Sequence, residues 1–343
     1  MTSSAQSALP ARRVLVTGGN GFVGHALGQA LHQAGQSVTL CTRVASLSAI
    51  PATARLVEAG VRWIGGCELS ETASWAHALQ GMDVVVHCAA RVHQLNDRTS
   101  NPLEVYRAEN TAASATLAMA AAAAGVRRFV FLSSVKVNGE FTAPGNAFRA
   151  ADQPHPSDPY GISKLEAELT IQQIASTSGM ECTIIRPPLV YGPGVKANFH
   201  RLMGAIQQSR WLPLGAVTHN RRSMIGLDNL VDLIKTCIDH PMAANQTMMA
   251  SDGEDLSTAD LVLRLAKAMN QKPRLLPVPP WLLQATASAI GKRDVALRLL
   301  GNLQVDSSPT RSLLGWQPPL SVDEGLMRAV RGLLHPPSCK PGT

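Results

Sequence analysis

The sequence has few aromatic residues, few charged residues and no paired cysteines. Aromatic residues make up 4% of the 343 residues, which leaves few rings on which nucleobases could stack, so we expect no nucleic-acid partner. The six cysteines lie far apart, without a CxxC pair or a short spacing to histidine; this argues against a disulfide scaffold and predicts no metal site. Charged residues at 16% and hydrophobic residues at 45% exclude a disordered chain.

Long hydrophobic runs are also missing. The longest weakly apolar stretch, residues 111–126, is rich in alanine and too short to span a bilayer. Residues 1–12 are polar and show no secretory signal. We therefore expect a cytoplasmic protein without stable membrane insertion. The 31 Lys and Arg residues outnumber 24 Asp and Glu residues, and the resulting net charge of +7 suits a phosphorylated small ligand.

Short apolar or β-branched runs alternate with helical patterns through the first half of the chain. The predicted strands are Val14–Val16, Val38–Cys41, Asp83–His87, Arg128–Leu132 and Thr183–Arg186. The predicted helices are Gly24–Ala34, Thr72–Gln80, Glu104–Ala124 and Tyr160–Ser176. This alternation predicts an α/β fold, with a Rossmann-type, doubly wound parallel sheet.

After about Tyr191, prolines become frequent and the helical patterns shorten, as in Thr258–Met269 and Trp281–Ile290. We expect a smaller, mixed C-terminal substrate domain here. The predicted units are the Rossmann domain (12–190, with a return segment at about 220–245), the substrate domain (191–335) and flexible termini (1–11 and 336–343).

Residues 280–300 fit two descriptions. They could form an amphipathic helix on a membrane surface, with Lys292, Arg293 and Arg298 as its basic face. Packing onto its own domain is the commoner outcome for such a segment, and is the one we expect.

A glycine-rich turn, Thr17-Gly-Gly-Asn-Gly-Phe-Val-Gly24, follows the first predicted strand. Gly18 permits a tight turn, Gly21 lets the backbone approach a pyrophosphate, and Gly24 allows the following helix to pack closely on the strand. The N-terminus of that helix faces the anion. At the first strand-to-helix junction of a parallel sheet, the pattern predicts a dinucleotide site.

Tyr160 and Lys164 are four residues apart in a predicted helix, so they share one of its faces. A nearby ammonium favours the phenolate, so we expect Lys164 to lower the pKa of Tyr160. Ser134 follows the predicted strand Arg128–Leu132, at the end where open α/β sheets place their ligands. These three side chains together predict a site of proton transfer beside the dinucleotide.

On these motifs the chain resembles the extended short-chain dehydrogenases/reductases of the nucleotide-sugar epimerase/dehydratase type, from about Arg13 to Leu334. The resemblance implies that Ser134, Tyr160 and Lys164 are catalytic and that Asn110 supports Lys164. It implies a UDP-sugar substrate, held by Ser134, Lys136, Asn198 and Arg222. The implied cofactor contacts are Gly18, Gly21, Phe22, Val23, Gly24, Thr42, Arg43, Glu68, Ala89, Ala90, Tyr160, Lys164 and Pro187.

The sequence departs from the family at the end of the second strand. Thr42 replaces the acidic residue that usually holds the adenosine ribose, and Arg43 follows it. Because Arg43 could pair with a 2′-phosphate, we predict a preference for NADP(H), with NAD(H) as the possible alternative. Glu68 takes the place of an aspartate near the adenine. Asn138 replaces a tyrosine after Ser134, and His93 is expected to have a structural role.

Several segments, among them Ser134–Glu140 and Arg186–Phe199, resemble bacterial reductases that form UDP-N-acetylquinovosamine for surface polysaccharide. The resemblance implies reduction of a UDP-4-keto-6-deoxy-N-acetylhexosamine at C4. A UDP-hexose or UDP-N-acetylhexosamine 4-epimerase with tightly bound NAD would use the same residues, and a non-catalytic dinucleotide sensor is a further alternative. A dehydratase is disfavoured, because no Asp-Glu pair stands beside Ser134. The resemblance also implies a homodimer, formed through Glu104–Ala124 and Tyr160–Ser176.

Overall fold

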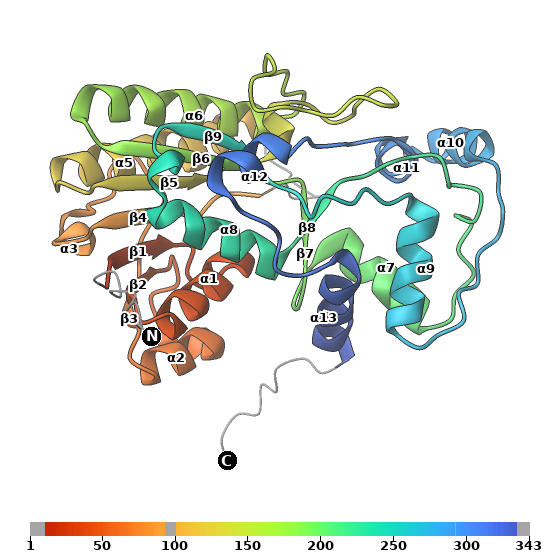
Figure 1. The fold of residues 1–343 in the computed structure, drawn as a ribbon, viewed down its shortest axis with the longest axis horizontal. Helices are drawn as coiled ribbons and strands as arrows, with labels where there is room; N and C mark the ends of the chain where they lie inside the picture. Colours follow the sequence, from red (N-terminus) through yellow and green to blue (C-terminus); the bar gives the residue numbers. More distant parts are fainter. Residues whose placement is uncertain (1–10, 93–100, 292, 335–343) are drawn as a thin grey trace, which may run out of the picture.

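The computed structural model describes residues 11–92, 101–291 and 293–334. Seven parallel strands form the main sheet in the order β3-β2-β1-β4-β5-β6-β9 (Figure 1), so the predicted Rossmann-type sheet is confirmed. The strands are β1 (Arg13–Thr17), β2 (Ser37–Cys41), β3 (Arg62–Ile64), β4 (Val84–His87), β5 (Arg128–Leu132), β6 (Glu181–Arg186) and β9 (Gln246–Met249). The strand order reverses between β1 and β4, which is where open α/β sheets bind their ligands.

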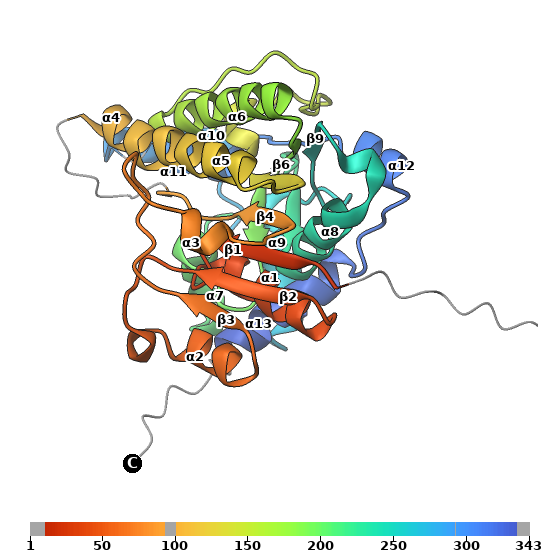
Figure 2. The same ribbon diagram turned by 90° about the vertical axis from the view of Figure 1, so that its left-hand side faces the viewer.

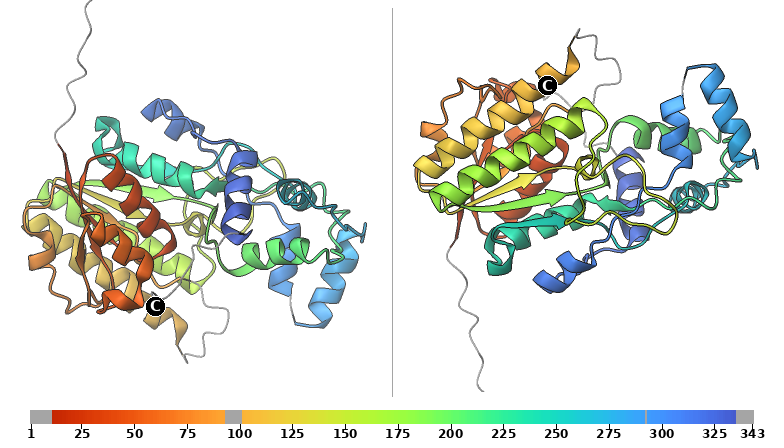
Figure 3. Two further views of the ribbon diagram at one scale, coloured as in Figure 1. Left: turned by 90° about the horizontal axis from the view of Figure 1, so that it is seen from below. Right: turned by 90° about the horizontal axis from the view of Figure 1, so that it is seen from above.

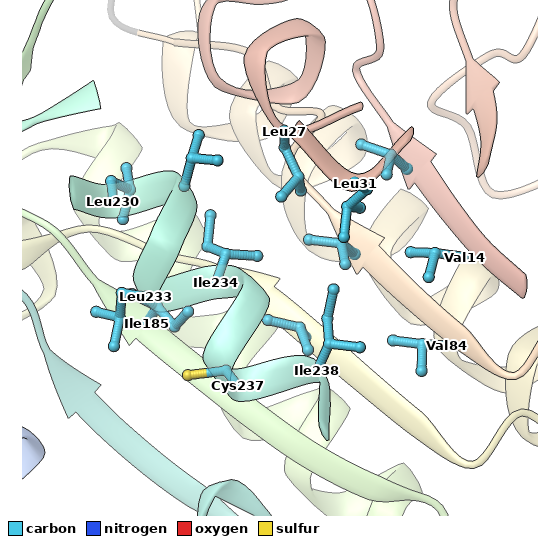
Figure 4. Packing of buried hydrophobic residues seen from close by; sticks show 14 of the residues in the cluster. Val14, Leu27, Leu31, Val84, Ile185, Leu230, Leu233, Ile234, Cys237 and Ile238 are labelled. Carbon is cyan, nitrogen blue, oxygen red and sulfur yellow. The ribbon is translucent and has the colours of Figure 1, made fainter. Parts of the chain in front are cut away.

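Helices cover both faces of this sheet (Figure 2). On one face lie α1 (Phe22–Gln33), α2 (Pro51–Glu58) and α8 (Leu227–Asp239). On the other lie α3 (Ala76–Leu79), α5 (Ala113–Ala123) and α6 (Pro159–Ser178). Successive residues of a strand point to opposite faces, so Val84 and Val86 join the first core and Val85 joins the second. Figure 4 shows Leu27 of α1 and Ile234 of α8 packed in the first core.

The C-terminal part of the chain extends from one end of the sheet (Figure 3). Two short parallel strands, β7 (Leu189–Tyr191) and β8 (Met224–Gly226), lie at its base. Its helices are α7 (Ala197–Gln207), α9 (Thr258–Ala268), α10 (Pro280–Ala289), α11 (Arg293–Leu300), α12 (Ser308–Leu314) and α13 (Val322–Leu334). A separate core joins α7, α9 and α13 through residues such as Met203, Leu265 and Leu326. Within the described ranges, no helix is both long and apolar enough to cross a bilayer.

Two predicted helices differ from the structure. The pattern at 104–124 is divided into α4 (Pro102–Tyr106), a π-helical turn η2 (Arg107–Ala112) and α5. A π-turn holds one more residue than an α-turn and is frequent at functional sites. The predicted helix 72–80 is shortened to α3, because Trp75 turns into the core (3% exposed) and the residues before it form a loop. The remaining short helices are η1 (Leu47–Ala49), η3 (Val135–Val137) and η4 (Pro241–Ala243).

Candidate active site

The glycine-rich turn follows β1 directly and is closely packed. Gly18 has a φ of +68°, a conformation that favours glycine, and a Cβ there would lie 3.0 Å from the backbone of Ala89. A Cβ on Gly24 would lie 2.3 Å from the carbonyl oxygen of Gly18, so α1 can approach the turn only with glycine at that position. The Gly21 amide donates a hydrogen bond to Gly18 O (2.8 Å) and closes the turn.

The N-terminus of α1 is available to an anion. The helix begins at Phe22 and Val23, its N-cap residue Gly21 offers no side-chain cap, and its first turn contains no acidic residue. Ala89 and Ala90 follow β4, across the switch point of the sheet from this turn. A helix N-terminus with free amide groups beside a glycine turn matches the requirements of a pyrophosphate. The residues present therefore fit a dinucleotide cofactor.

The predicted adenosine contacts lie at the ends of β2 and β3. Thr42 is buried, and its hydroxyl donates to Val44 O (2.9 Å) and accepts from Trp63 Nε1 (2.9 Å). Arg43 is 74% exposed, and its guanidinium lies 3.7 Å from a carboxylate oxygen of Glu109. Glu68 lines a hollow of about 380 Å³ formed by the loop after β3.

The structure brings Ser134, Tyr160 and Lys164 to the carboxyl end of β5. Ser134 caps η3, where its hydroxyl accepts a hydrogen bond from Lys136 N (3.3 Å), and Tyr160 and Lys164 lie on the first turns of α6. A hydrogen bond with Ser134 acts on the Tyr160 phenol. The Lys164 side chain is buried, with its ammonium 3.8 Å from the centroid of the Phe131 ring. This geometry can hold and move a proton.

Burial is the largest cause of the pKa shifts of Tyr160 and Lys164 on α6. It raises the pKa of Tyr160, as do the charges of Asp158 and Tyr106, while the hydrogen bond with Ser134 lowers it. The shift is therefore opposite to the one predicted from the sequence, because burial and the charges of Asp158 and Tyr106 all raise the pKa and together outweigh the effect of Ser134. Burial lowers the pKa of Lys164 to about 7, and Glu168, one turn further along α6, opposes this shift.

Asn110 lies in the π-helical turn and joins two segments of the site. Its side-chain amide donates to Arg91 O (3.1 Å) and to Ser163 Oγ (3.0 Å), and its side-chain oxygen accepts from Arg91 N (2.7 Å). Ser163 directly precedes Lys164. Asn110 thus connects the loop after β4 to the helix that carries Lys164, through direct contacts with that loop and Ser163.

A chain of buried hydrogen bonds runs from β1 to the π-helical turn through His87, which the sequence analysis did not single out. Ser114 donates to Asn110 O, so its hydroxyl must accept from His87 Nε2 (2.9 Å). The neutral ring then accepts at Nδ1 from the Thr17 hydroxyl (2.7 Å). Burial lowers the pKa of His87 to about 3, and the charge of Lys164 acts in the same direction, so the ring is neutral at physiological pH.

Lys136 connects the turn of Ser134 to the start of α6. Its ammonium contacts Glu140 (2.5 Å) and Asp158, and the Asp158 side chain also accepts from Gly161 N (2.7 Å) as the N-cap of α6. A Cβ on Gly161 would lie 2.8 Å from Lys136 O, so the two elements touch at this glycine. The predicted substrate contact is therefore a residue engaged by two carboxylates in this structure.

A buried ion pair lies behind Lys164. Arg186 on β6 donates to Glu168 (3.0 Å from Nε) and to Asn138 Oδ1 (3.1 Å). The Asn138 amide in turn donates to Arg149 O (2.9 Å). The asparagine that replaces the family's tyrosine is thus the third member of a buried polar network.

The remaining predicted residues lie between the sheet and the C-terminal part. Arg222 exchanges backbone hydrogen bonds with Leu256 (2.9 and 3.1 Å), and its Nη1 donates to Gly301 O (3.2 Å). Burial lowers the pKa of Arg222; the carboxylate of Glu140 opposes this shift, and the charge of Arg298 adds to it. Two guanidinium groups within electrostatic reach of each other are suited to a dianionic ligand.

The other predicted residues come from separate elements. Asn198 is exposed on the first turn of α7, and Pro187 is buried, with its carbonyl accepting from Val135 N (2.9 Å). His93 lies outside the described residues. The sequence analysis did not associate Arg298 with the site, because it placed that residue on a separate basic face.

Comparison with known proteins adds to this geometry. The sequence profile of the NAD dependent epimerase/dehydratase family matches residues 14–249. A UDP-glucose 4-epimerase of Vibrio cholerae is 43% identical over 324 residues, which cover 94% of this chain and 96% of that protein. The N-acetyl-alpha-D-glucosaminyl-diphospho-ditrans,octacis-undecaprenol 4-epimerase of Escherichia coli O157:H7 is 28% identical over 271 residues, covering 74% of this chain and 78% of that protein.

Solved structures show the same fold. The UDP-glucuronic acid 4-epimerase from Bacillus cereus, in complex with NAD, superposes with a TM-score of 0.75 at 20% identity, and the match covers 94% of this chain and 99% of that one. The profile match spans both the glycine-rich turn and the residues Ser134, Tyr160 and Lys164. The chain therefore belongs to the NAD dependent epimerase/dehydratase family.

Proposed function

We propose that this protein is a 4-epimerase of a UDP-hexose or UDP-N-acetylhexosamine that uses a bound NAD. The observation that carries the proposal is the convergence of Ser134, Tyr160 and Lys164 at the carboxyl edge of the sheet, beside a glycine turn that fits a dinucleotide. The 43% identity to the Vibrio cholerae UDP-glucose 4-epimerase, over nearly the whole of both chains, supports this choice of reaction.

The chain's own residues would hold the ligands and move one proton. Gly18, Gly21 and the first turn of α1 would bind the pyrophosphate, and Lys164 would bind the nicotinamide ribose. When bound, NAD supplies hydride chemistry at C4 of the sugar. Tyr160 would exchange the proton on the sugar O4 and Ser134 would hydrogen-bond the same oxygen.

Arg222 and Arg298 would bind the diphosphate, together with Asn198. Binding at this remote group positions the sugar at Tyr160 without itself taking part in the reaction. Burial and the charge of Arg298 lower the pKa of Arg222 against the opposing charge of Glu140, and a diphosphate would add further negative charge beside the guanidinium.

We propose NAD(H) as the cofactor in preference to NADP(H). The preference predicted for NADP(H) depends on a free Arg43, whereas its guanidinium lies near Glu109, a carboxylate that would repel a 2′-phosphate. The fold neighbour from Bacillus cereus contains NAD. Identification of the dinucleotide released on denaturing the purified protein would test the choice, and release of NADP would contradict it.

A 4-keto-sugar reductase remains the second candidate. Its proton donor would be the protonated Tyr160 phenol, the form that burial favours. The resemblance of Ser134–Glu140 and Arg186–Phe199 to the UDP-N-acetylquinovosamine-forming reductases points the same way.

One assay separates the two reactions. The purified protein is incubated with UDP-glucose, UDP-N-acetylglucosamine or the UDP-4-keto-6-deoxy-N-acetylhexosamine, with and without added NADH. Interconversion of the C4 epimers without net cofactor consumption supports the epimerase. Stoichiometric oxidation of NADH with the keto sugar supports the reductase. Tyr160→Phe should abolish either activity.

We also propose a homodimer formed through α5 and α6. These helices pack on each other, and Met119 (54% exposed) and Leu169 (58% exposed) stand on their outer surfaces. A second copy of the same pair of helices would bury both side chains in a self-complementary interface. Leu169→Glu should convert the dimer to a monomer in light scattering.

A further inference from the structure

The helix α10 leaves its apolar side chains on the surface. None of its described residues is buried, and Trp281 at its start is 69% exposed. Ile290, just after the helix, is 67% exposed. One of its residues, Leu283, packs against the core of the C-terminal part, and the helix otherwise contacts α11 (Figure 1). The expectation that residues 280–300 pack onto their own domain is therefore met by α11, where Ala296 is buried, and only in part by α10, through Leu283.

A second exposed apolar pair lies just before this helix. Trp211 is 60% exposed and Leu276 is 42% exposed. Their segments are joined by backbone hydrogen bonds, from Leu212 N to Arg274 O and from Leu276 N to Leu212 O (both 2.8 Å). We call the set Trp211, Leu276, Trp281, Leu282, Ile290 and Val295 the α10–α11 face. Two of the five tryptophans of the chain lie on it.

Positive charge surrounds the α10–α11 face. Residues 272–300 contain five basic residues and one acidic residue, a net +4 out of +7 for the whole chain. Arg274 lies beside Trp211, with its guanidinium 5.7 Å from the ring centroid, and Arg293 is exposed at the start of α11. Exposed tryptophan, aliphatic side chains and cations in one short segment are typical of helices that bind at the interface of an anionic bilayer.

We propose that the α10–α11 face docks this protein onto the surface of an anionic phospholipid bilayer. Trp281 and Leu282, adjacent in the first turn of α10, enter the headgroup region, and the surrounding cations bind the lipid phosphates. A second copy of the chain is a poorer occupant, because two faces of the same positive charge repel each other. The proposed dimer helices α5 and α6 lie on the main sheet, away from α10 and α11 (Figure 1).

Docking at this face would bring the candidate site close to the bilayer. α11 ends at Leu300, and the next residue, Gly301, accepts the hydrogen bond from Arg222. The charge of Arg298, on the same helix, lowers the pKa of Arg222. Helix α11 of the α10–α11 face is thus continuous in the chain with the segment that contacts Arg222, a proposed diphosphate-binding residue. Membrane docking goes beyond the proposed reaction and does not depend on it.

Flotation of the full chain with lipid vesicles tests the proposal. The vesicles contain phosphatidylcholine alone, or phosphatidylcholine with 30% phosphatidylglycerol. We expect the protein to float with the anionic vesicles in 0.1 M NaCl and to be released in 0.5 M NaCl. Trp281→Ser/Leu282→Ser should weaken this binding by about tenfold or more. Met242→Ser, which removes an apolar side chain 53% exposed in η4, should leave it unchanged.

Each further result of this experiment either supports or overturns the proposed docking. Because Trp281 and Leu282 are exposed, their replacement should not lower the melting temperature, and Arg293→Glu provides a second variant that should also weaken binding. Failure of the unaltered chain to float with anionic vesicles would overturn the proposal. Equal lipid binding by the double variant and the unaltered chain would also overturn it. So would a loss of self-association in the double variant without any lipid binding, because that result would assign the face to a second copy of the chain. Epimerase or reductase activity is not needed for any of these results.

Discussion

The neutral His87 should leave a measurable mark on the pH dependence of folding. Its pKa is lowered from 6.5 to about 3 in the folded chain, so the unfolded chain binds a proton between these values that the folded chain does not. The stability contributed by the neutral ring is fully present above pH 6.5 and is lost progressively as the pH falls towards 3. Each pH unit within this window costs the folded state at most about 1.4 kcal/mol.

His87→Gln isolates this contribution, because glutamine keeps a donor and an acceptor but does not titrate in this range. At pH 7 we expect the variant to be less stable by about 2 kcal/mol, since the side-chain amide cannot reach both the Thr17 and the Ser114 hydroxyls with good geometry. By pH 5 the unaltered chain has lost about 2 kcal/mol through His87, so the two should be of nearly equal stability.

Urea unfolding at pH 7, 6 and 5 measures the difference in free energy of unfolding between the two chains. His155→Gln, at an exposed position, serves as the control and should follow the unaltered chain at each pH. A difference between the unaltered chain and His87→Gln that stays constant from pH 7 to pH 5 would falsify the assignment of a neutral, buried ring at His87.

Three further perturbations test the site. Glu168→Gln should lower the free energy of unfolding by about 3–5 kcal/mol in urea, because it leaves the buried Arg186 without its carboxylate partner. Lys136→Met should move the alkaline limb of the pH–rate profile to higher pH, because it leaves the carboxylates near Tyr160 without a counter-charge; an unmoved limb would contradict this role. Gly24→Ala should weaken dinucleotide binding by about tenfold or more in calorimetry, because its Cβ would lie 2.3 Å from the backbone of the glycine turn.

The sequence predicts the sheet where its strands are apolar on both sides. Val84, Val85 and Val86 are all fully buried, so an uninterrupted apolar run is a sufficient signal. β3 has only three residues, and none of them is fully buried, because it lies at the edge of the sheet. β9 begins with two polar residues, Gln246 and Thr247, and its place beside β6 depends on a return of the chain that local patterns do not show.

The site is predictable where its residues are close in sequence. The spacing of Tyr160 and Lys164 on one helix carries that information locally. The contact between Thr17 and His87 cannot be predicted from local sequence. It depends on the parallel register of β1 with β4, which pairs these two residues although they are 70 positions apart in the chain. Asn138 likewise gains its role only when Arg186 arrives on β6.

Lys164 differs from the other buried charged residues of the site. Arg186 and Glu168 neutralise each other, whereas in the described part of the chain the ammonium of Lys164 donates no hydrogen bond and lies against the ring of Phe131. Its lowered pKa is the cost of that environment. The free protein already bears the unfavourable free energy of burying the Lys164 ammonium without an acceptor. Ribose hydroxyl groups would supply acceptors on binding, so part of this unfavourable free energy would be recovered in the complex. The free energy recovered by these hydrogen bonds contributes only to the bound state. It would favour the tight binding of the dinucleotide that the proposed epimerase needs between its two half-reactions.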